Sequence, residues 1–211
     1  MTLTEQLKEY ADNSVKRHPG EAQVIMRNAI EALEATDILE NATKTGDQFP
    51  DFTLPNAKGA LIQLSSLLEK GKVVLTFYRG GWCPYCNIAL KALQNTLPEI
   101  NAKGANLVAI TPETPDNTLT TLEKNELGFE VLSSENNELA RSLGLVYQLP
   151  ENLVTLYKKF GIDLIESQGN EASELPIAAT YIIEQNGNVS YHFLAEDYKL
   201  RADPLDIIAA L

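Results

Sequence analysis

The sequence predicts an α/β protein in which a central mixed sheet is flanked by helices and preceded by a two-helix extension. Three features support this fold class. Strand-like and helix-like segments alternate after about residue 60, a strong hairpin signal stands at residues 186–187, and two amphipathic stretches come first. The 211 residues, 44% of them apolar, suffice for one ordinary domain with an appendage. We therefore divide the chain into a helical extension, residues 1–45, and a main domain, residues 46–211.

The extension is predicted to hold two helices. Apolar residues recur at helical spacing from Leu3 to about Val15 and from Glu21 to about Thr36, and Pro19-Gly20 interrupts the pattern between them. Residues 41–55 contain too many helix breakers for a long helix and connect to the main domain. Each helix has one apolar face, which either packs on the main domain or forms the interface of a homodimer.

The main domain alternates between short apolar runs and helical patterns. Ser66 and Glu69 resemble a capping box at the start of a short helical turn. Asn186-Gly187 is the strongest local hairpin signal, and it adds an antiparallel edge to an otherwise parallel sheet. Residues 162–178 have no clear period. The expected strands are residues 61–64, 73–78, 107–111, 129–132, 180–184 and 189–194, and the expected helices are residues 84–100, 116–126, 136–143, 151–160 and a terminal helix opened by Asp203-Pro204.

Charge and composition exclude several classes of partner. The 29 acidic and 17 basic residues give a net charge of −12, which opposes binding to nucleic acid or to anionic lipid. The first thirty residues lack the apolar core of a signal peptide, and no run approaches the roughly 18 apolar residues of a membrane span. We expect a cytoplasmic protein with no membrane partner.

The chain has two cysteines, Cys83 and Cys86, in the run Trp82-Cys83-Pro84-Tyr85-Cys86. A single C-x-x-C without a secretion signal indicates redox chemistry or half of a metal site. Zinc would need two more ligands, and His18 and His192 stand singly and far apart. We therefore predict a redox dithiol with neither metal nor cofactor.

The position of the dithiol suggests different roles for its two sulfurs. Cys83 stands where a strand gives way to a helix, and the helix N-terminus stabilises a thiolate. Cys86 shares a helical stripe with Leu90 and Leu93, so it should face the sheet. We expect Cys83 to be the exposed attacking sulfur and Cys86 the buried resolving one. The plainer alternative is a pair of small buried apolar residues. Pro98 should bend or end this helix near residues 94–97.

Four neighbours of the dithiol are candidate site residues. Arg79 could stabilise a thiolate or hold a substrate oxygen, or it could form an ordinary surface ion pair. Gly81, after Gly80, lets a backbone N–H approach a substrate, or it only makes the turn. Trp82 is interpreted as a hydrophobic lid beside the sulfur. Thr111 ends the next strand at the same edge of the sheet, where it could contact the reactive centre or only shape the strand exit.

Four segments together resemble the peroxiredoxin-like branch of the alkyl hydroperoxide reductase C/thiol-specific antioxidant (AhpC/TSA) family, which has a thioredoxin-like fold. They are residues 46–54, 77–86, 180–184 and 197–211. The resemblance implies that Cys83 reduces a peroxide and becomes a sulfenic acid, which Cys86 resolves to an intrachain disulfide. A thioredoxin- or glutaredoxin-type donor would then reduce the disulfide.

The sequence departs from the family pattern at two positions. The family carries a threonine three residues before its peroxidatic cysteine, where this chain has Gly80, and an arginine before the late strand, where it has Ala178. The Cys-Pro-Tyr-Cys run also fits a thiol–disulfide oxidoreductase or a redox sensor, and a thioredoxin-fold scaffold that merely binds partners is a third possibility.

Overall fold

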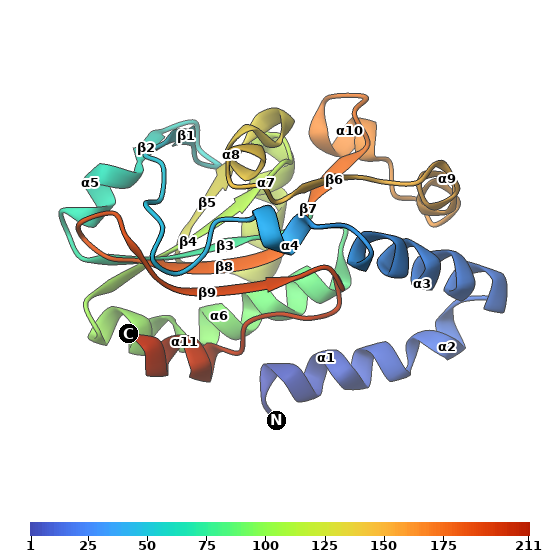
Figure 1. Cartoon of the computed structure of the whole chain (residues 1–211), viewed down its shortest axis with the longest axis horizontal. Coiled ribbons are helices and arrows are strands. Elements are labelled where there is room, and N and C mark those ends of the chain that lie inside the picture. Colours follow the sequence, from blue (N-terminus) through green and yellow to red (C-terminus); the bar gives the residue numbers. More distant parts are fainter.

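The centre of the molecule is a five-stranded mixed sheet, seen in a computed structural model that describes residues 1–211 apart from the Val15 side chain. The strand order is β5-β4-β3-β8-β9, with β3 parallel to β4, β4 parallel to β5, and the remaining neighbours antiparallel (Figure 1). The predicted mixed sheet and its late hairpin are therefore confirmed. The strands are β3 (Lys72–Phe77), β4 (Ala105–Thr111), β5 (Glu130–Ser133), β8 (Ala178–Ile183) and β9 (Val189–Ala195).

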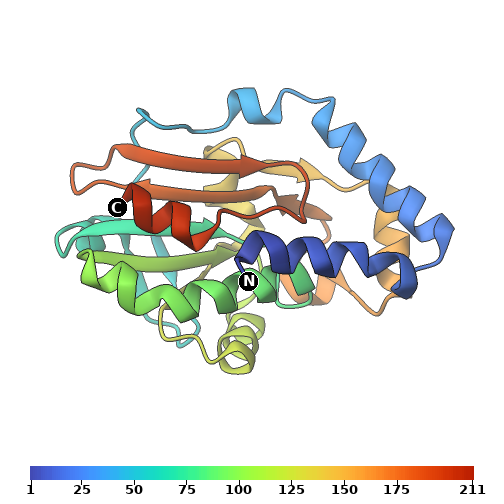
Figure 2. The ribbon, with the colours of Figure 1, turned by 90° about the horizontal axis from the view of Figure 1, so that it is seen from below.

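Helices cover both faces of this sheet. Successive side chains of β3 alternate between two cores, so that Val74 packs toward α6 (Pro84–Ala102) and Leu75 packs toward the opposite face. In Figure 1 the helices α6, α1 and α11 lie below the sheet, and in Figure 2, the view from below, they lie together in front of it. The helices of that side are α1 (Leu3–Asp12), α6, α7 (Pro115–Asn125) and α11 (Pro204–Ala210), and those of the other side are α4 (Ile38–Asn41), α5 (Leu64–Leu68) and α8 (Glu138–Ser142).

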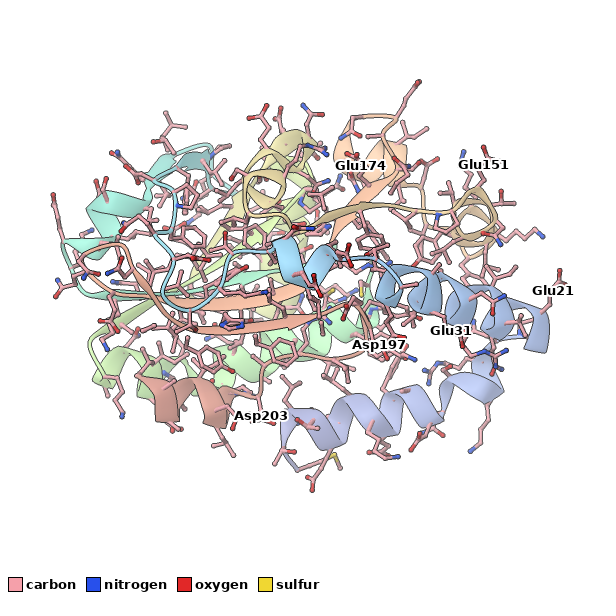
Figure 3. All side chains as sticks on the ribbon, viewed as in Figure 1. Glu21, Glu31, Glu151, Glu174, Asp197 and Asp203 are labelled. Atoms are coloured by element: carbon pink, nitrogen blue, oxygen red, sulfur yellow. The ribbon has the colours of Figure 1, made fainter. Side chains whose placement is uncertain are left out.

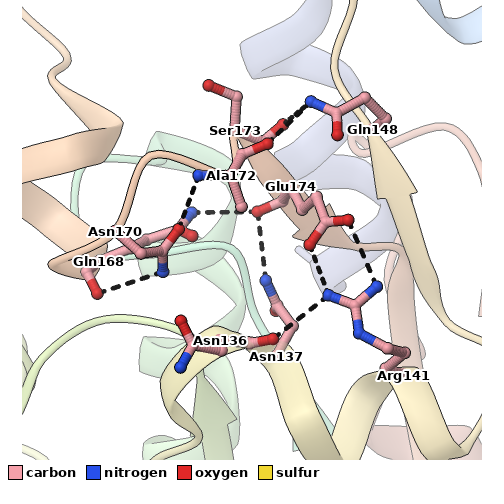
Figure 4. A network of polar contacts seen from close by, with 9 residues as sticks. All are labelled: Asn136, Asn137, Arg141, Gln148, Gln168, Asn170, Ala172, Ser173 and Glu174. Atoms are coloured by element: carbon pink, nitrogen blue, oxygen red, sulfur yellow. Dashed lines mark hydrogen bonds and ion pairs between the residues drawn. The ribbon is translucent and has the colours of Figure 1, made fainter.

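The segment between β5 and β8, called the excursion below, lies outside the central sheet and forms part of a third, smaller core. In that core β7 (Glu174–Pro176) and α9 (Glu151–Lys159) pack against α3 (Gly20–Glu34) through Leu175, Leu156 and Ala22. The loop before β7 is anchored by Glu174, whose carbonyl accepts from Asn137 and Gln168 (Figure 4). The excursion consists of η1 (Glu135–Asn137), α8, β6 (Val146–Gln148), α9 (Glu151–Lys159), α10 (Leu164–Gln168) and β7 (Glu174–Pro176), and a separate hairpin is formed by β1 (Thr53–Pro55) and β2 (Leu61–Gln63).

The N-terminal helices lie against the main domain. Leu3 and Leu7 of α1 are buried beside α6, and the Asp203 carboxylate accepts from the backbone N–H of Thr4 at 3.2 Å. Figure 3 shows Asp203 beside the start of α1. The short helix α2 (Ser14–Arg17) joins α1 to α3. Packing on the main domain, one of the two arrangements considered for these helices, is therefore the one observed.

Two local expectations need correction. Pro98 does not end α6, which continues to Ala102, because burial of Ile100 offsets the one lost backbone hydrogen bond. Ser66 and Glu69 do not form a capping box, since α5 already begins at Leu64, whose N–H bonds to the Phe52 carbonyl at 3.1 Å. No helix in the described part of the chain is long and apolar enough to cross a membrane.

Candidate active site

Cys83 is the N-cap residue of α6, as the sequence predicted. Its N–H donates to the Gly80 carbonyl at 3.1 Å, which closes the turn after β3, and its own carbonyl accepts from Asn87 N at 3.1 Å. Pro84 takes the first helical position, where its missing N–H costs no hydrogen bond. Both cysteines are free thiols in this structure.

The prediction that Cys83 is exposed was wrong. Cys83 is 1% exposed and Cys86 is 0% exposed, because helices from the N-terminal extension cover the start of α6. A difference in access nevertheless remains. Cys83 lines a pocket of about 420 Å³, and Cys86 is not among the lining residues. A small molecule in this pocket would meet Cys83 first.

Arg201 is a site residue that the sequence did not reveal. It is only 8% exposed, and its Nη2 donates to Cys86 Sγ at 3.0 Å. Its Nη1 donates to the carbonyl of Tyr198 at 2.7 Å, which fixes the guanidinium in the loop after β9. The segment 197–211 carried part of the family resemblance, and this was the only signal that could have pointed to it.

The surroundings favour a thiolate on Cys86. Burial raises the pKa of Cys86, but the hydrogen bond from Cys83 and the charges of Arg201 and Arg79 outweigh it and hold the pKa well below its ordinary value. Burial, the Cys86 hydrogen bond and the Cys86 charge together hold the pKa of Cys83 well above its ordinary value. The helix-dipole argument from sequence placed the low pKa on Cys83. The hydrogen bond that Cys83 gives to Cys86, with the charges of the two arginines, moves it to Cys86, so the pair shares one proton.

Arg79 is buried at the floor of the pocket. Its Nη2 donates to the Tyr157 hydroxyl, and its guanidinium carbon lies 5.0 Å from the Trp82 ring centroid and 4.6 Å from that of Tyr198. The Nε of Arg79 has no hydrogen-bond partner among the described residues. Arg79 is 2% exposed, so the surface ion pair considered from sequence is wrong.

The two glycines before the dithiol make room for a buried carboxylate. Gly81 N donates to Glu113 Oε2 at 2.8 Å, and Ser167 Oγ donates to Glu113 Oε1 at 2.8 Å. Gly80 adopts φ 151°, and a Cβ there would lie 2.3 Å from Trp82 Nε1 and 2.9 Å from Glu113 Oε1. A threonine therefore cannot replace Gly80 without displacing this cluster. The Gly81 N–H is occupied by Glu113 and does not face the pocket that Cys83 lines.

Thr111 lies behind the site. It is 1% exposed, its Oγ1 accepts from Glu113 N at 3.4 Å, and its carbonyl accepts from Ser134 N at 2.8 Å. It is not among the residues that line the pocket over Cys83. Of the two interpretations drawn from sequence, shaping the strand exit is the one these contacts fit. Trp82 does line the pocket beside Cys83, in agreement with its expected position as a lid.

A cysteine pair at the N-terminus of a helix, directly after the central strand of a mixed sheet, is an arrangement typical of the thioredoxin-like fold. The sequence model of the AhpC/TSA family matches residues 45–192, and this chain belongs to that family. It is 32% identical over 102 residues to the bcp protein of Buchnera aphidicola, and 27% identical over 105 residues to peroxiredoxin Bcp of Escherichia coli K12. The match covers 48% of this chain and 64% of the Buchnera protein, so the chain spans somewhat less than two thirds of that relative.

Solved structures share the fold. Peroxidoxin BcpB from Mycobacterium tuberculosis aligns with a TM-score of 0.63 at 22% identity, over 80% of this chain and 96% of that one. A cysteine-to-serine mutant of peroxiredoxin 6 from Arenicola marina also aligns at 0.63, with 16% identity over 79% of this chain and 70% of that one. At these identities the alignments support the thioredoxin-like fold of the main domain.

Proposed function

We propose that the protein is a thiol peroxidase that reduces hydrogen peroxide or an organic hydroperoxide through Cys83. The observation that carries the proposal is the arrangement around this sulfur. Cys83 faces a pocket, the Cys86 thiolate lies behind it and shares a hydrogen bond with it through which a proton can pass, and Arg79 Nε is an unpaired donor at the pocket floor. The relatives named as peroxiredoxins support the same class of reaction.

In the first step Cys86 takes the Cys83 proton, and the Cys83 thiolate attacks the terminal oxygen of the hydroperoxide. The oxygen–oxygen bond breaks and Cys83 becomes a sulfenic acid. The leaving alkoxide takes from Cys86 the proton that Cys83 gave up, which makes an alcohol, or water when the substrate is hydrogen peroxide, and leaves Cys86 a thiolate again. Arg79 donates to the peroxide oxygens and stabilises the charge on the leaving one. This is the role that an arginine at position 178 would otherwise serve.

In the second step the Cys86 thiolate attacks the sulfenic sulfur, the sulfur–oxygen bond breaks and a disulfide forms, and the hydroxide that leaves takes a proton from solvent to become water. Arg201 donates a hydrogen bond to Cys86 Sγ and stabilises the thiolate that makes this attack. The C-x-x-C spacing keeps both sulfurs within one turn of α6, so resolution needs little unwinding. A thioredoxin- or glutaredoxin-type dithiol then supplies two electrons and two protons to restore both thiols.

The opposite order, with Cys86 attacking, requires a peroxide to reach a sulfur that does not line the pocket. Exchange of disulfides with protein substrates, the alternative drawn from sequence, and re-reduction by a protein donor both require access to Cys83, which is 1% exposed. A protein donor would therefore have to move the helices that cover α6 before it could reach the disulfide.

The test is a peroxidase assay with hydrogen peroxide and a thioredoxin or glutaredoxin system, run on wild type, Cys83→Ser and Cys86→Ser. We expect turnover in wild type, none in Cys83→Ser, and a single turnover in Cys86→Ser. Insulin reduction measured on the same proteins separates the alternatives, because an exchange enzyme would reduce insulin and leave the peroxide unconsumed.

A further inference from the structure

The helices of the N-terminal extension cover the dithiol, and they lie outside the residues that the family model matches. Ring contacts join the extension to the main domain at this point. The ring centroids of Tyr10 and Tyr85 are 5.0 Å apart, and those of His18 and Phe160 are 4.7 Å apart. All four residues line the same pocket as Cys83. Access of a large molecule to Cys83 therefore depends on whether the extension stays in place.

The middle of the extension is held less firmly than the residues on either side of it. We call residues 8–21 the cover segment. Apart from Val15, whose side chain is not described, none of these residues is buried. Leu7 before the segment and Ala22 after it are each only 4% exposed. Opening of the cover segment alone therefore exposes less apolar surface than release of the whole extension would.

One loop of the main domain contacts the extension on both sides of the cover segment. This loop, residues 196–203, connects β9 to α11 and includes Asp203, which is labelled in Figure 3. The Asp203 carboxylate accepts from the N–H and from the hydroxyl of Thr4, at 3.2 Å each. The Tyr198 hydroxyl donates to Met26 Sδ at 3.5 Å. A shift of this loop would therefore loosen α1 and α3 together.

The same loop contacts the dithiol through Arg201. Its Nη2 donates to Cys86 Sγ at 3.0 Å, and its Nη1 donates to the carbonyl of Tyr198 at 2.7 Å. Tyr198 is also the residue whose hydroxyl contacts Met26. The guanidinium of Arg201 thus connects the inner sulfur to the loop that holds the extension.

The Cys86 thiolate is a negative charge beside two buried cations. Arg79 and Arg201 are both buried, and none of the ion pairs among the described residues includes either of them. A Cys83–Cys86 disulfide carries no charge, so its formation removes the thiolate and leaves two buried guanidinium groups without a counter-charge. A buried charge without a partner is strongly unfavourable, and entry of water relieves it.

We infer that formation of the disulfide opens the cover segment and admits the protein donor, and that reduction closes it again. Without the thiolate, Arg201 separates from Cys86, the loop moves, and its contacts with α1 and α3 loosen. Water then reaches the buried arginines, and Cys83 becomes accessible to a thioredoxin- or glutaredoxin-type protein. Helix α6 stays folded, because both cysteines lie within its first turn. The inference rests on the intrachain disulfide of the proposed function and assigns the regulation of that site to the extension.

The first test measures hydrogen–deuterium exchange of the full chain by mass spectrometry, with and without diamide. Diamide takes two electrons and two protons from the dithiol, so the disulfide forms without peroxide. In the disulfide form we expect amides of the cover segment to exchange about tenfold faster than in the reduced form, and those of α6 to be unchanged. Faster exchange in α6 alone, or no change in the cover segment, would overturn the inference. If diamide forms no Cys83–Cys86 disulfide, the inference is wrong together with the resolving role of Cys86.

The second test separates the charge from the disulfide bond. Cys83→Ser keeps the Cys86 thiolate and cannot form the disulfide, so its cover segment should stay closed with and without diamide. Cys83→Ser/Cys86→Ser has no thiolate, so its cover segment should exchange as fast as that of oxidised wild type even without an oxidant. If the double variant exchanges as slowly as Cys83→Ser, loss of the thiolate does not open the cover segment and the inference is wrong.

The third test removes the connection at Arg201. In Arg201→Met, exchange in the cover segment should differ by less than about twofold between the reduced and the oxidised protein. Arg27→Met is the matched control, since Arg27 is an exposed arginine of α3 that pairs with Glu31, and it should keep the full response. Cleavage by trypsin after Lys16 and Arg17 provides a second readout of the same opening. A wild-type response in Arg201→Met would contradict the inference.

Failure of the inference can be told apart from failure of the proposed function. If wild type consumes no peroxide but the diamide-formed disulfide opens the cover segment, the proposed function fails and the inference stands. If wild type reduces peroxide while the cover segment exchanges equally in both redox states, the proposed function stands and the inference is wrong.

Discussion

Arg201 Nη2 lies 3.0 Å from Cys86 Sγ, and the two residues are 115 positions apart in the sequence. The loop after β9 thus brings a buried cation to the inner sulfur of a dithiol whose outer sulfur faces the pocket. Together with the hydrogen bond from Cys83 and the charge of Arg79, this contact favours the thiolate, the reactive form of cysteine, on Cys86 in the resting protein.

Replacement of Arg201 should raise the pKa of Cys86. In Cys83→Ser, whose single remaining thiol is Cys86, we expect the ultraviolet absorbance of the thiolate to appear at lower pH than in free cysteine. In Cys83→Ser/Arg201→Met the transition should move to higher pH, whereas Arg201→Lys in the same background should keep part of the effect. An unchanged transition in the Arg201→Met protein would show that Arg201 does not stabilise the thiolate.

Replacement of Cys86 should trap the oxidised intermediate. In Cys86→Ser, one equivalent of peroxide should leave a sulfenic acid on Cys83, which dimedone labels and peptide mass spectrometry locates. Wild type treated in the same way should contain the Cys83–Cys86 disulfide and little label. Label on Cys86 in a Cys83→Ser protein that consumes peroxide at the wild-type rate would reverse the two roles.

Gly80→Ala should destabilise the protein by about 2–3 kcal/mol, because it adds a clash with Trp82 and Glu113 to an unfavourable φ. Gly59→Ala is a suitable control, since Gly59 has φ +79° and a Cβ at that position would have no atom within 4 Å. That substitution should cost about 1 kcal/mol, from the backbone conformation alone. Urea unfolding measures both. Equal losses of unfolding free energy in the two variants would mean that the close contacts of a Cβ at position 80 do not destabilise the protein.

Glu113 should make stability fall as pH rises. Burial raises the pKa of Glu113 above its ordinary value of 4.5, so in the window above 4.5 the folded protein binds more protons than the unfolded chain. The stabilising contribution of the protonated form is complete below that window and is lost as pH rises through the folded pKa. Glu113→Gln keeps acceptor capacity for Gly81 and should gain stability relative to wild type across this window. A stability difference between Glu113→Gln and wild type that does not change with pH would contradict a raised pKa of Glu113 in the folded protein.

Much of the fold follows from local sequence patterns. The β-branched run of β3, the Asn186-Gly187 turn and the Pro84 start of α6 each depend on nearby residues, and each was predicted correctly. The short pair β6 and β7 was not predicted, since three-residue strands joined across an excursion of more than twenty residues have no periodic signal. Helix α6 continues through Pro98 because the helix is buried in the tertiary structure, and helix propensities read from the local sequence do not include that burial.

The sequence predicted only those site residues that lie close together along the chain. Cys83, Cys86, Arg79 and Trp82 are neighbours in sequence, and the structure brings all four together. The positions of Arg201 and of the N-terminal helices beside Cys83 result from packing of the two ends of the chain on α6. No rule about residue spacing could therefore predict them. The same packing explains why Cys83 is buried although it caps a helix.

The most direct test of the account is a stopped-flow measurement of reduced protein mixed with peroxide, followed by Trp82 fluorescence. We predict second-order oxidation at least about a hundredfold faster than that of free cysteine at the same pH, as positioned proton transfer and charge stabilisation allow. The fast phase should be absent in Cys83→Ser. Oxidation at the rate of free cysteine would contradict the claim that this dithiol is a peroxidase centre.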